Sequence, residues 1–270
     1  MSPTPTPATV LGAEILELPG GGRALFTGRA HGNLSSVGGE RAEHGLQARE
    51  RLRKTIGVQR LVRGYQVHGT VVGRVFADGT RPDASQRPAP AGVDPPSTLE
   101  HDDSVHADRV DLLETDSIGQ PAFEADGHAT AAPDLAAMVL TADCIPVVLG
   151  AEGAVAALHA GWRGLAAGVL QEGVRALREV GGHGTVVAVV GPCAGPCCYE
   201  VGEEVHAAFD GVHRDGRLID LRAIAHERLL AAGVAEVRDA PACTICDERF
   251  FSHRREGVRA GRQAGIAWIE

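Results

Sequence analysis

The chain lacks the segments that would place it in a membrane or direct it to secretion. Nowhere do about 18 apolar residues follow one another without interruption, so no membrane-spanning helix is expected. The stretch Met1–Pro7 has neither a basic region nor an apolar one, which argues against a secretory signal. We therefore expect a cytoplasmic protein with no membrane partner.

An excess of positive charge is also missing. Lys and Arg total 26 residues against 35 Asp and Glu, and the formal net charge is -9. Nucleic acids and anionic membranes are bound chiefly through clustered positive charge, so neither is expected as a partner. A small molecule is the more plausible ligand.

Two common nucleotide-binding motifs are absent as well. The sequence contains neither the GxGxxG pattern of dinucleotide-binding folds nor a P-loop, and it has no internal repeat. Function must therefore be sought in individual reactive side chains.

The chain does have enough apolar residues for a large core. It is 270 residues long and 44% hydrophobic, sufficient for one sizeable catalytic domain, which we place at residues 10–270. Residues 1–9 alternate Pro and Thr and predict a disordered tail. The segment Arg81–Asp108 carries five prolines without apolar periodicity, which predicts a long surface loop or insertion.

Short apolar runs alternate with segments of helical spacing. The predicted strands are Val67–Phe76, Ala136–Leu140, Ile145–Leu149, Val155–Leu158 and Thr185–Val190. The predicted helices are Glu43–Ile56, Leu165–Val180, Glu203–Phe209 and Ala223–Ala232. This mixture predicts an α+β fold, a layered sandwich whose mixed sheets are covered by helices.

Three short runs each place a His or Cys where an apolar stretch meets small residues. They put forward His68, Cys144 and His159 as one site. Two imidazoles and a thiolate suit zinc, and three protein ligands leave a fourth position open, as in catalytic zinc sites. Each residue alone has an ordinary alternative, a buried cysteine or a structural histidine.

Two neighbouring residues add chemistry to these runs. Asp143 precedes Cys144 and can orient a ligand or carry a proton. Arg163 lies just ahead of a predicted helix, where a guanidinium and free backbone N–H groups can receive an anion. A surface ion pair is an equally good interpretation of Arg163.

The remaining cysteines are expected to be free thiols. A chain of this size does not need disulfides, and cytoplasmic thiols are kept reduced. Cys243 and Cys246 have the spacing of a zinc knuckle, but a structural zinc usually needs a second such pair. Cys197 and Cys198 lack the two-residue gap, so we do not expect a structural zinc here.

Taken together, these runs resemble the YfiH-like (DUF152) family, described both as laccase-domain multicopper polyphenol oxidases and as purine nucleoside phosphorylases. The matching runs, in the family's order, are Phe26–Arg29, Gln66–Gly69, Thr141–Pro146, His159–Gly164, Gly191–Pro192, Cys198–Gly202, Cys243–Cys246 and Phe251–Arg255. They cover nearly the whole chain from Phe26.

The resemblance implies a single-domain sandwich with zinc held by His68, Cys144 and His159. It implies phosphorolysis of adenosine, inosine, guanosine and methylthioadenosine, together with hydrolytic deamination of adenosine. Purine nucleosides and phosphate are then the partners, with Asp143, Cys144 and His159 in catalysis. Arg29 or Arg163 would hold phosphate.

Two departures from the family pattern concern polar residues. The chain shortens a Gly-rich segment to Ala30–Ser36, within which Asn33 is expected to keep a substrate-binding role. His128 stands where relatives more often have an apolar residue. We expect it to be a surface residue rather than an extra ligand.

Other functions remain open at this stage. Cys144 and His159 could form the nucleophile and base of a metal-free cysteine hydrolase. Some relatives are assigned to editing of cell-wall precursors, and a non-catalytic binding protein is a further alternative. Copper is possible as the bound ion, although multicopper electron transfer needs more clustered histidines than these motifs offer.

Overall fold

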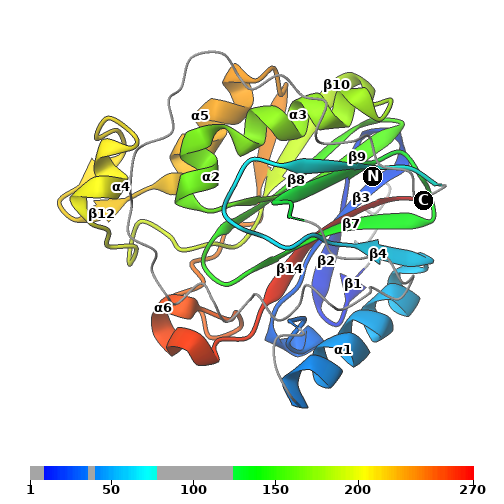
Figure 1. Cartoon of the computed structure of the whole chain (residues 1–270), viewed down its shortest axis with the longest axis horizontal. Coiled ribbons are helices and arrows are strands. Elements are labelled where there is room, and N and C mark those ends of the chain that lie inside the picture. Colours follow the sequence, from blue (N-terminus) through cyan, green and yellow to red (C-terminus); the bar gives the residue numbers. More distant parts are fainter. Residues whose placement is uncertain (1–8, 36–39, 78–123) are drawn as a thin grey trace, which may run out of the picture.

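Two six-stranded sheets pack face to face at the centre of the computed structural model, and helices cover their outer faces (Figure 1). The structure describes residues 9–35, 40–77 and 124–270. Most of the expected tail at residues 1–9, and the whole Pro-rich segment at 81–108, lie outside the described residues. The first strand begins at Thr9.

The first sheet combines the two ends of the described chain. Its strands, in spatial order, are β1 (Thr9–Val10), β2 (Ala13–Glu17), β3 (Gly22–Phe26), β14 (Gln263–Ile269), β7 (Leu135–Thr141) and β4 (Arg60–Val62). Neighbours are antiparallel except β4 and β7. Helix α1 (Glu40–Ile56) packs on this sheet through Ala48 and Leu52, which join a core cluster with Met138.

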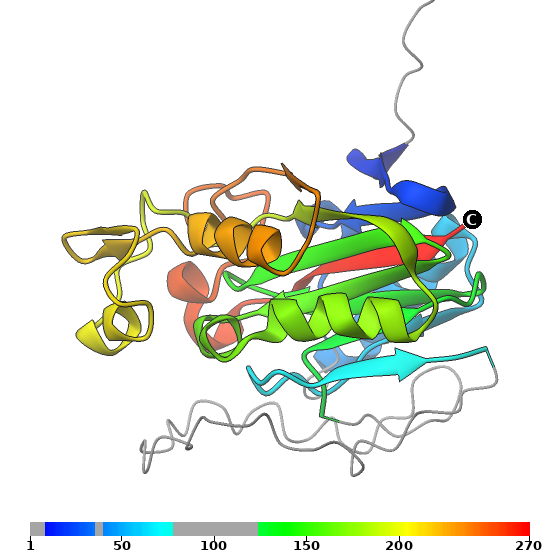
Figure 2. The same cartoon turned by 90° about the horizontal axis from the view of Figure 1, so that it is seen from above.

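The second sheet carries the longest buried strands. Its order is β13 (Glu236–Asp239), β10 (His183–Val190), β8 (Ile145–Glu152), β9 (Ala154–Ala160), β6 (Gly127–Thr130) and β5 (Val72–Val75). β10 runs parallel to β13, and β5 runs parallel to β6. Helices α3 (Val169–Glu179) and α5 (Leu221–Ala231) lie over its outer face (Figure 2).

Smaller elements extend from one end of the sandwich. Helix α4 (Glu203–Ala207) and the hairpin of β11 (Arg214–Asp215) and β12 (Leu218–Ile219) lie together there, and α6 (His253–Glu256) lies below them in Figure 1. Short 3-10 turns occur at Pro19–Gly21, Arg29–His31 and Gly257–Arg259. No helix in the described ranges is both long and apolar enough to cross a membrane.

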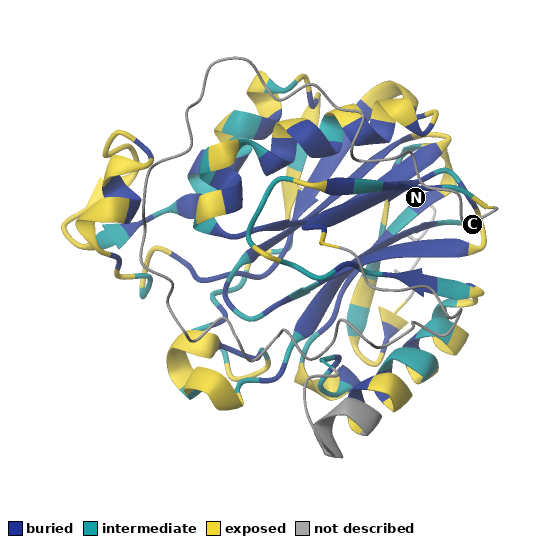
Figure 3. Cartoon of the chain, in the orientation of Figure 1, coloured by how far each residue is buried: buried dark blue, intermediate teal, exposed yellow. Residues whose placement is uncertain are grey.

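Most sheet residues are buried, drawn in dark blue, whereas the outward faces of the helices are exposed (Figure 3). Leu158, Leu170 and Leu177 are fully buried between the second sheet and its helices. Phe26 and Val189 fill the space between the two sheets. Burial of this apolar surface, at about 25 cal/mol per Å², supplies the main force for folding.

The predicted layered α+β sandwich is confirmed, but two predicted elements were wrong in part. The single helix expected at Leu165–Val180 is divided at Gly168, whose φ of +100° separates α2 (Trp162–Ala167) from α3. The strand expected at Val67–Phe76 forms only over Val72–Val75. Its first residues turn instead, and His68 has a φ of +59°.

Candidate metal centre

The second sheet brings the three predicted ligands together at one edge. Cys144 immediately precedes β8, and His159 lies near the end of the antiparallel neighbour β9, opposite Pro146. His68 comes from the turn before β5. The ligand atoms of these three residues all lie within 4.8 Å of one another.

A buried carboxylate, Asp126, organises two of the three ligands. One of its oxygens, Oδ1, accepts the backbone N–H of His68 at 2.9 Å and faces His159 Nδ1 at 2.8 Å. The other oxygen accepts the N–H groups of Val67 and Gly69 at 3.2 and 2.7 Å. This network fixes the turn that carries His68 and leaves His159 Nε2 as the ring nitrogen available to a metal.

The site also depends on close backbone approach. A Cβ atom added at Gly161 would lie 2.5 Å from His68 Cδ2 and 3.4 Å from Cys144 Sγ. A larger residue at 161 would therefore displace the His68 ring from its place beside Cys144. This contact explains why a glycine follows the His159–Ala160 strand end.

The electrostatics favour a thiolate at Cys144. Burial alone would raise the pKa of this thiol, but the charge of His159 and hydrogen bonds from both imidazoles outweigh it and lower the pKa to about 5. For His159, burial opposes the charged form, yet Cys144 and Asp126 raise its pKa to about 10. The pair is therefore a thiolate beside an imidazolium, held by a buried carboxylate.

The donor geometry fits a tetrahedral metal ion. His68 Nε2 and Cys144 Sγ are 3.7 Å apart. Zinc bonds of about 2.3 Å to sulfur and 2.0–2.1 Å to nitrogen imply a separation of about 3.6 Å between two such ligands. His68, Cys144 and His159 would hold the ion and leave one position open to a water or substrate.

Comparison with known proteins agrees with this fold. The model of the family described as "Multi-copper polyphenol oxidoreductase laccase" matches residues 23–270. The chain belongs to this family. Among curated members, the protein named purine nucleoside phosphorylase of Xylella fastidiosa is 41% identical over 192 residues, covering 64% of this chain and 72% of that one.

A further curated relative and two solved structures are also similar to this chain. A Pseudomonas aeruginosa protein, also named a purine nucleoside phosphorylase, is 37% identical over 183 residues, covering 62% of this chain and 73% of its own. A solved DUF152 protein of Neisseria meningitidis superposes with a TM-score of 0.69 at 25% identity, covering 96% and 99% of the two chains. YlmD of Geobacillus stearothermophilus also has a TM-score of 0.69 at 25% identity, with 93% and 92% covered.

Within this family fold, Asp143 lies beside the candidate metal ligands and is held by two hydrogen bonds. Its side chain accepts the Thr244 hydroxyl at 2.6 Å and the backbone N–H of Arg254 at 2.7 Å. Its φ of +92° is unusual for a residue other than glycine. The surrounding loops therefore fix the position of this carboxylate next to Cys144.

The predicted substrate-binding residues are in different surroundings. Arg163 is exposed in the first turn of α2, with its guanidinium 4.3 Å from the centre of the Trp162 ring. Arg29 instead forms an ion pair with Glu256 and donates to the Phe250 carbonyl. It is therefore already engaged in holding two segments together.

Asn33 has a structural role that the sequence did not reveal, and His128 differs from its expected exposure. Asn33 Oδ1 accepts the backbone N–H groups of Ser35 and Arg262 at 3.0 and 2.8 Å, which joins two loops. The expectation that His128 is a surface residue was wrong. It is 1% exposed because β6 lies between β5 and β9.

The sequence assigned no role to Asp126, although this carboxylate positions two of the three candidate ligands. Tyr199 likewise had no role of its own in the sequence analysis, where it lies within the run Cys198–Gly202. Burial raises the pKa of the Tyr199 phenol to about 12, and the charge of Cys144 adds to this effect. Arg254 stacks on the Tyr199 ring with its guanidinium 4.8 Å from the ring centre. A protonated phenol and a guanidinium thus stand close to the candidate metal centre.

Proposed function

We propose that the chain is a zinc-dependent purine nucleoside enzyme. It would cleave adenosine, inosine, guanosine and methylthioadenosine with phosphate and would also deaminate adenosine by hydrolysis. The observation that carries this proposal is the convergence of His68, Cys144 and His159 around one open position, with Asp126 behind them. The names of the curated relatives support the substrate class.

The donor set supports zinc over copper as the catalytic ion. One thiolate and two imidazoles in a tetrahedral arrangement suit zinc, which needs no redox partner. Multicopper electron transfer needs several histidines at each of several sites. Among the described residues, only this cluster of possible ligands contains histidine.

Deamination requires a nucleophilic water and a group that moves protons at the purine C6. When bound, zinc supplies the Lewis acidity that activates such a water. Asp143 is the candidate proton carrier because its carboxylate is nearly buried and fixed beside Cys144. Tyr199, with its raised pKa, would remain a hydrogen-bond donor to the substrate at neutral pH.

Phosphorolysis requires an anion held beside the ribose C1′ while the purine leaves. Arg163 is the better candidate to hold it, because its side chain is exposed directly after the Gly161 turn. Arg29 would have to leave Glu256 before it could bind phosphate. We therefore assign the phosphate contact first to Arg163 and only secondarily to Arg29.

The test is a product analysis with adenosine. The purified protein is incubated with adenosine, with and without phosphate, and adenine, inosine and hypoxanthine are separated by chromatography. We expect adenine only when phosphate is present, and inosine under both conditions. Failure to form any of these products with zinc-loaded protein would contradict the proposal.

A metal-free cysteine hydrolase is the second candidate, and one observation favours it. A carboxylate, an imidazole and a thiolate lie in a row in space, from Asp126 through His159 to Cys144. This arrangement activates the cysteine in catalytic Cys–His sites. The two functions differ in their response to metal removal. A hydrolase of this kind would keep its activity after chelation, whereas the proposed zinc enzyme would lose it and recover it with added zinc.

A further inference from the structure

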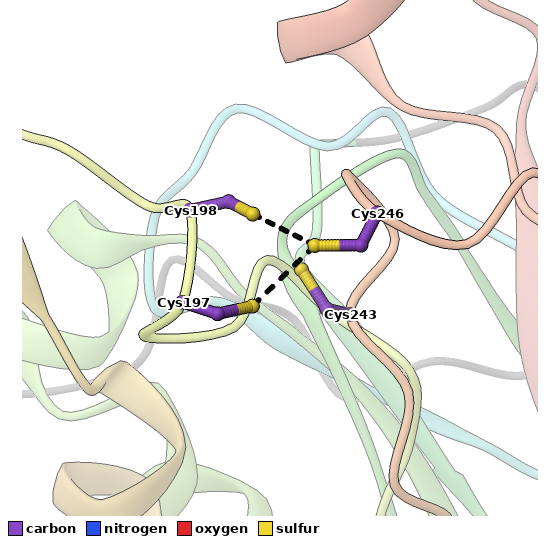
Figure 4. Close-up of side chains that lie close together, drawn as sticks. All are labelled: Cys197, Cys198, Cys243 and Cys246. Carbon is purple, nitrogen blue, oxygen red and sulfur yellow. Dashed lines mark hydrogen bonds between the residues drawn. The ribbon is translucent and has the colours of Figure 1, made fainter.

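Four cysteines outside the candidate metal centre gather at one point on the surface. Cys197 and Cys198 come from the loop after β10, and Cys243 and Cys246 come from the loop after β13. Their sulfur atoms all lie within 4.8 Å of one another. Figure 4 shows the four side chains directed toward a common centre.

The sheet explains why these loops meet. β10 and β13 are parallel neighbours, with Val190 opposite Asp239, so both strands lead into loops at the same edge. The pairing continues into the loops, where Cys193 forms a parallel bridge with Cys243. The Cys193 N–H donates to the Ala242 carbonyl at 3.2 Å, and the Thr244 N–H donates to the Cys193 carbonyl at 3.0 Å. The convergence is thus built into the fold.

The loop conformations direct the thiols inward. The Asp247 N–H donates to the Cys243 carbonyl at 2.9 Å and closes a turn over Cys243–Cys246. On the other loop, the N–H groups of Cys198 and Tyr199 both donate to the Gly195 carbonyl, at 3.1 and 3.0 Å. This second turn bends the chain at Cys197 and Cys198 so that both thiols face the same centre. Two adjacent cysteines can therefore face one centre without the two-residue gap of a zinc knuckle.

The four sulfur atoms are close enough together to share one ion: the Cys197–Cys246 separation is near that of two zinc ligands, and the shorter Cys198–Cys246 separation exceeds a disulfide bond. Cys246 Sγ lies 2.7 Å from Cys198 Sγ and 3.5 Å from Cys197 Sγ. A disulfide bond is about 2.05 Å long, and four thiolates around zinc lie about 3.8 Å apart, given bonds of about 2.3 Å. The Gly195 N–H also donates to Cys243 Sγ at 3.3 Å, and such a donor stabilises a thiolate.

We propose that Cys197, Cys198, Cys243 and Cys246 bind a second metal ion, a soft divalent cation such as zinc, in a structural site. Four protein thiolates fill all four tetrahedral positions, so this ion has no place for a substrate. The prediction that this chain has no structural zinc was drawn from spacing alone. The three-dimensional arrangement supports the opposite conclusion.

The second ion would stabilise the wall of the catalytic site. The loops that carry the four cysteines also hold Asp143: the Ala194 N–H donates to its carbonyl at 2.8 Å, and the Thr244 hydroxyl donates to its carboxylate at 2.6 Å. A metal joining the two loops would therefore keep Asp143, and Cys144 after it, in place. The assignment of this ion does not depend on the proposed nucleoside chemistry.

Metal content of the full chain, purified under reducing conditions, provides the test. We expect about two zinc ions per chain in the wild type, about one in a Cys197→Ser, Cys246→Ser variant, and about one in Cys144→Ser. Cys197 and Cys246 are exposed, so their replacement disturbs the core least. Cys193→Ala is the matched control, since Cys193 is buried beside the cluster but outside it, and it should keep both ions.

Added Co²⁺ gives a readout that needs neither turnover nor replacement of any of the four clustered cysteines. Chelator-stripped wild-type protein and Cys144→Ser should both develop the strong charge-transfer absorption of a tetrathiolate cobalt site. Absence of this absorption, or equal zinc content in the wild type and the Cys197→Ser, Cys246→Ser variant, would overturn the proposal. So would a Cys198–Cys246 disulfide detected by peptide mass spectrometry in the purified protein.

Discussion

The Asp126 carboxylate offers the sharpest test of how the metal centre is built. In Asp126→Asn one of the two oxygens becomes an NH₂ group. Oδ1 faces the His68 N–H and His159, and Oδ2 faces the Val67 and Gly69 N–H groups. In either orientation of the Asn side chain, its NH₂ group would face N–H donors, so the hydrogen bonds on that side would be lost.

The size of the effect follows from these contacts. Loss of a carboxylate that orients a metal-binding histidine typically weakens metal binding by about 10- to 100-fold. That range corresponds to about 1.4–2.7 kcal/mol. A lost hydrogen bond to a charged group also costs about 1.5–3 kcal/mol of folding stability, so the variant should melt at a lower temperature as well.

Zinc affinity should be measured by competition with a chromophoric chelator, alongside thermal unfolding. Asp210→Asn is the matched control, because Asp210 is exposed and has a φ of +53°, which Asn tolerates. It should leave zinc affinity unchanged. If Asp126→Asn binds zinc as tightly as the wild type while folded, Asp126 does not organise the site and the reasoning is refuted.

Three further predictions concern a buried ion pair, the phosphate contact and the Cys144 thiol. Arg74→Ala should lower the free energy of unfolding by about 3–5 kcal/mol, because Arg74 is buried and pairs with Glu172 at 2.6 Å. Urea unfolding measures this change, and a loss below about 1 kcal/mol would contradict the prediction. Arg163→Ala should reduce kcat/KM for phosphorolysis by about 10- to 100-fold and spare deamination, whereas equal loss of both would place Arg163 in general substrate binding. In metal-stripped protein, alkylation of Cys144, followed by peptide mass spectrometry, should have its pH midpoint near 5, since only the thiolate reacts and its pKa is lowered. His159→Gln removes the positive charge beside Cys144 and should raise the pH midpoint of alkylation. A wild-type midpoint near that of an ordinary thiol would show that Cys144 and His159 do not form a thiolate–imidazolium pair.

Much of the fold could be predicted because its signal is local. The runs that became β7, β8, β9 and β10 are apolar, short and bounded by turn residues, and they form where the sequence predicts. Gly168 has no distinctive local pattern, yet its left-handed conformation divides the predicted helix. The turn at His68 is held by Asp126, which is 58 residues away in sequence, so apolar content alone could not exclude a strand there.

The clustering of His68, Cys144 and His159 could be predicted because each is a reactive side chain at the end of an apolar run. Asp126 carried no such signal, since an Asp before a Gly is common in loops and its four N–H contacts come from distant segments. The four-cysteine cluster depends on the parallel pairing of β10 with β13, which no local pattern reveals. Cys197 and Cys198 are adjacent and lack the two-residue gap of a zinc knuckle, so spacing alone did not join them to Cys243 and Cys246.

The central claim is that the zinc held by His68, Cys144 and His159 carries the nucleoside chemistry. The most direct measurement compares phosphate-dependent release of adenine from adenosine, together with zinc content, in the wild type and in Cys144→Ala. We predict that the variant loses one zinc ion per chain and the release of adenine together, while remaining folded. A folded variant that has lost this zinc but releases adenine at the wild-type rate would contradict the account.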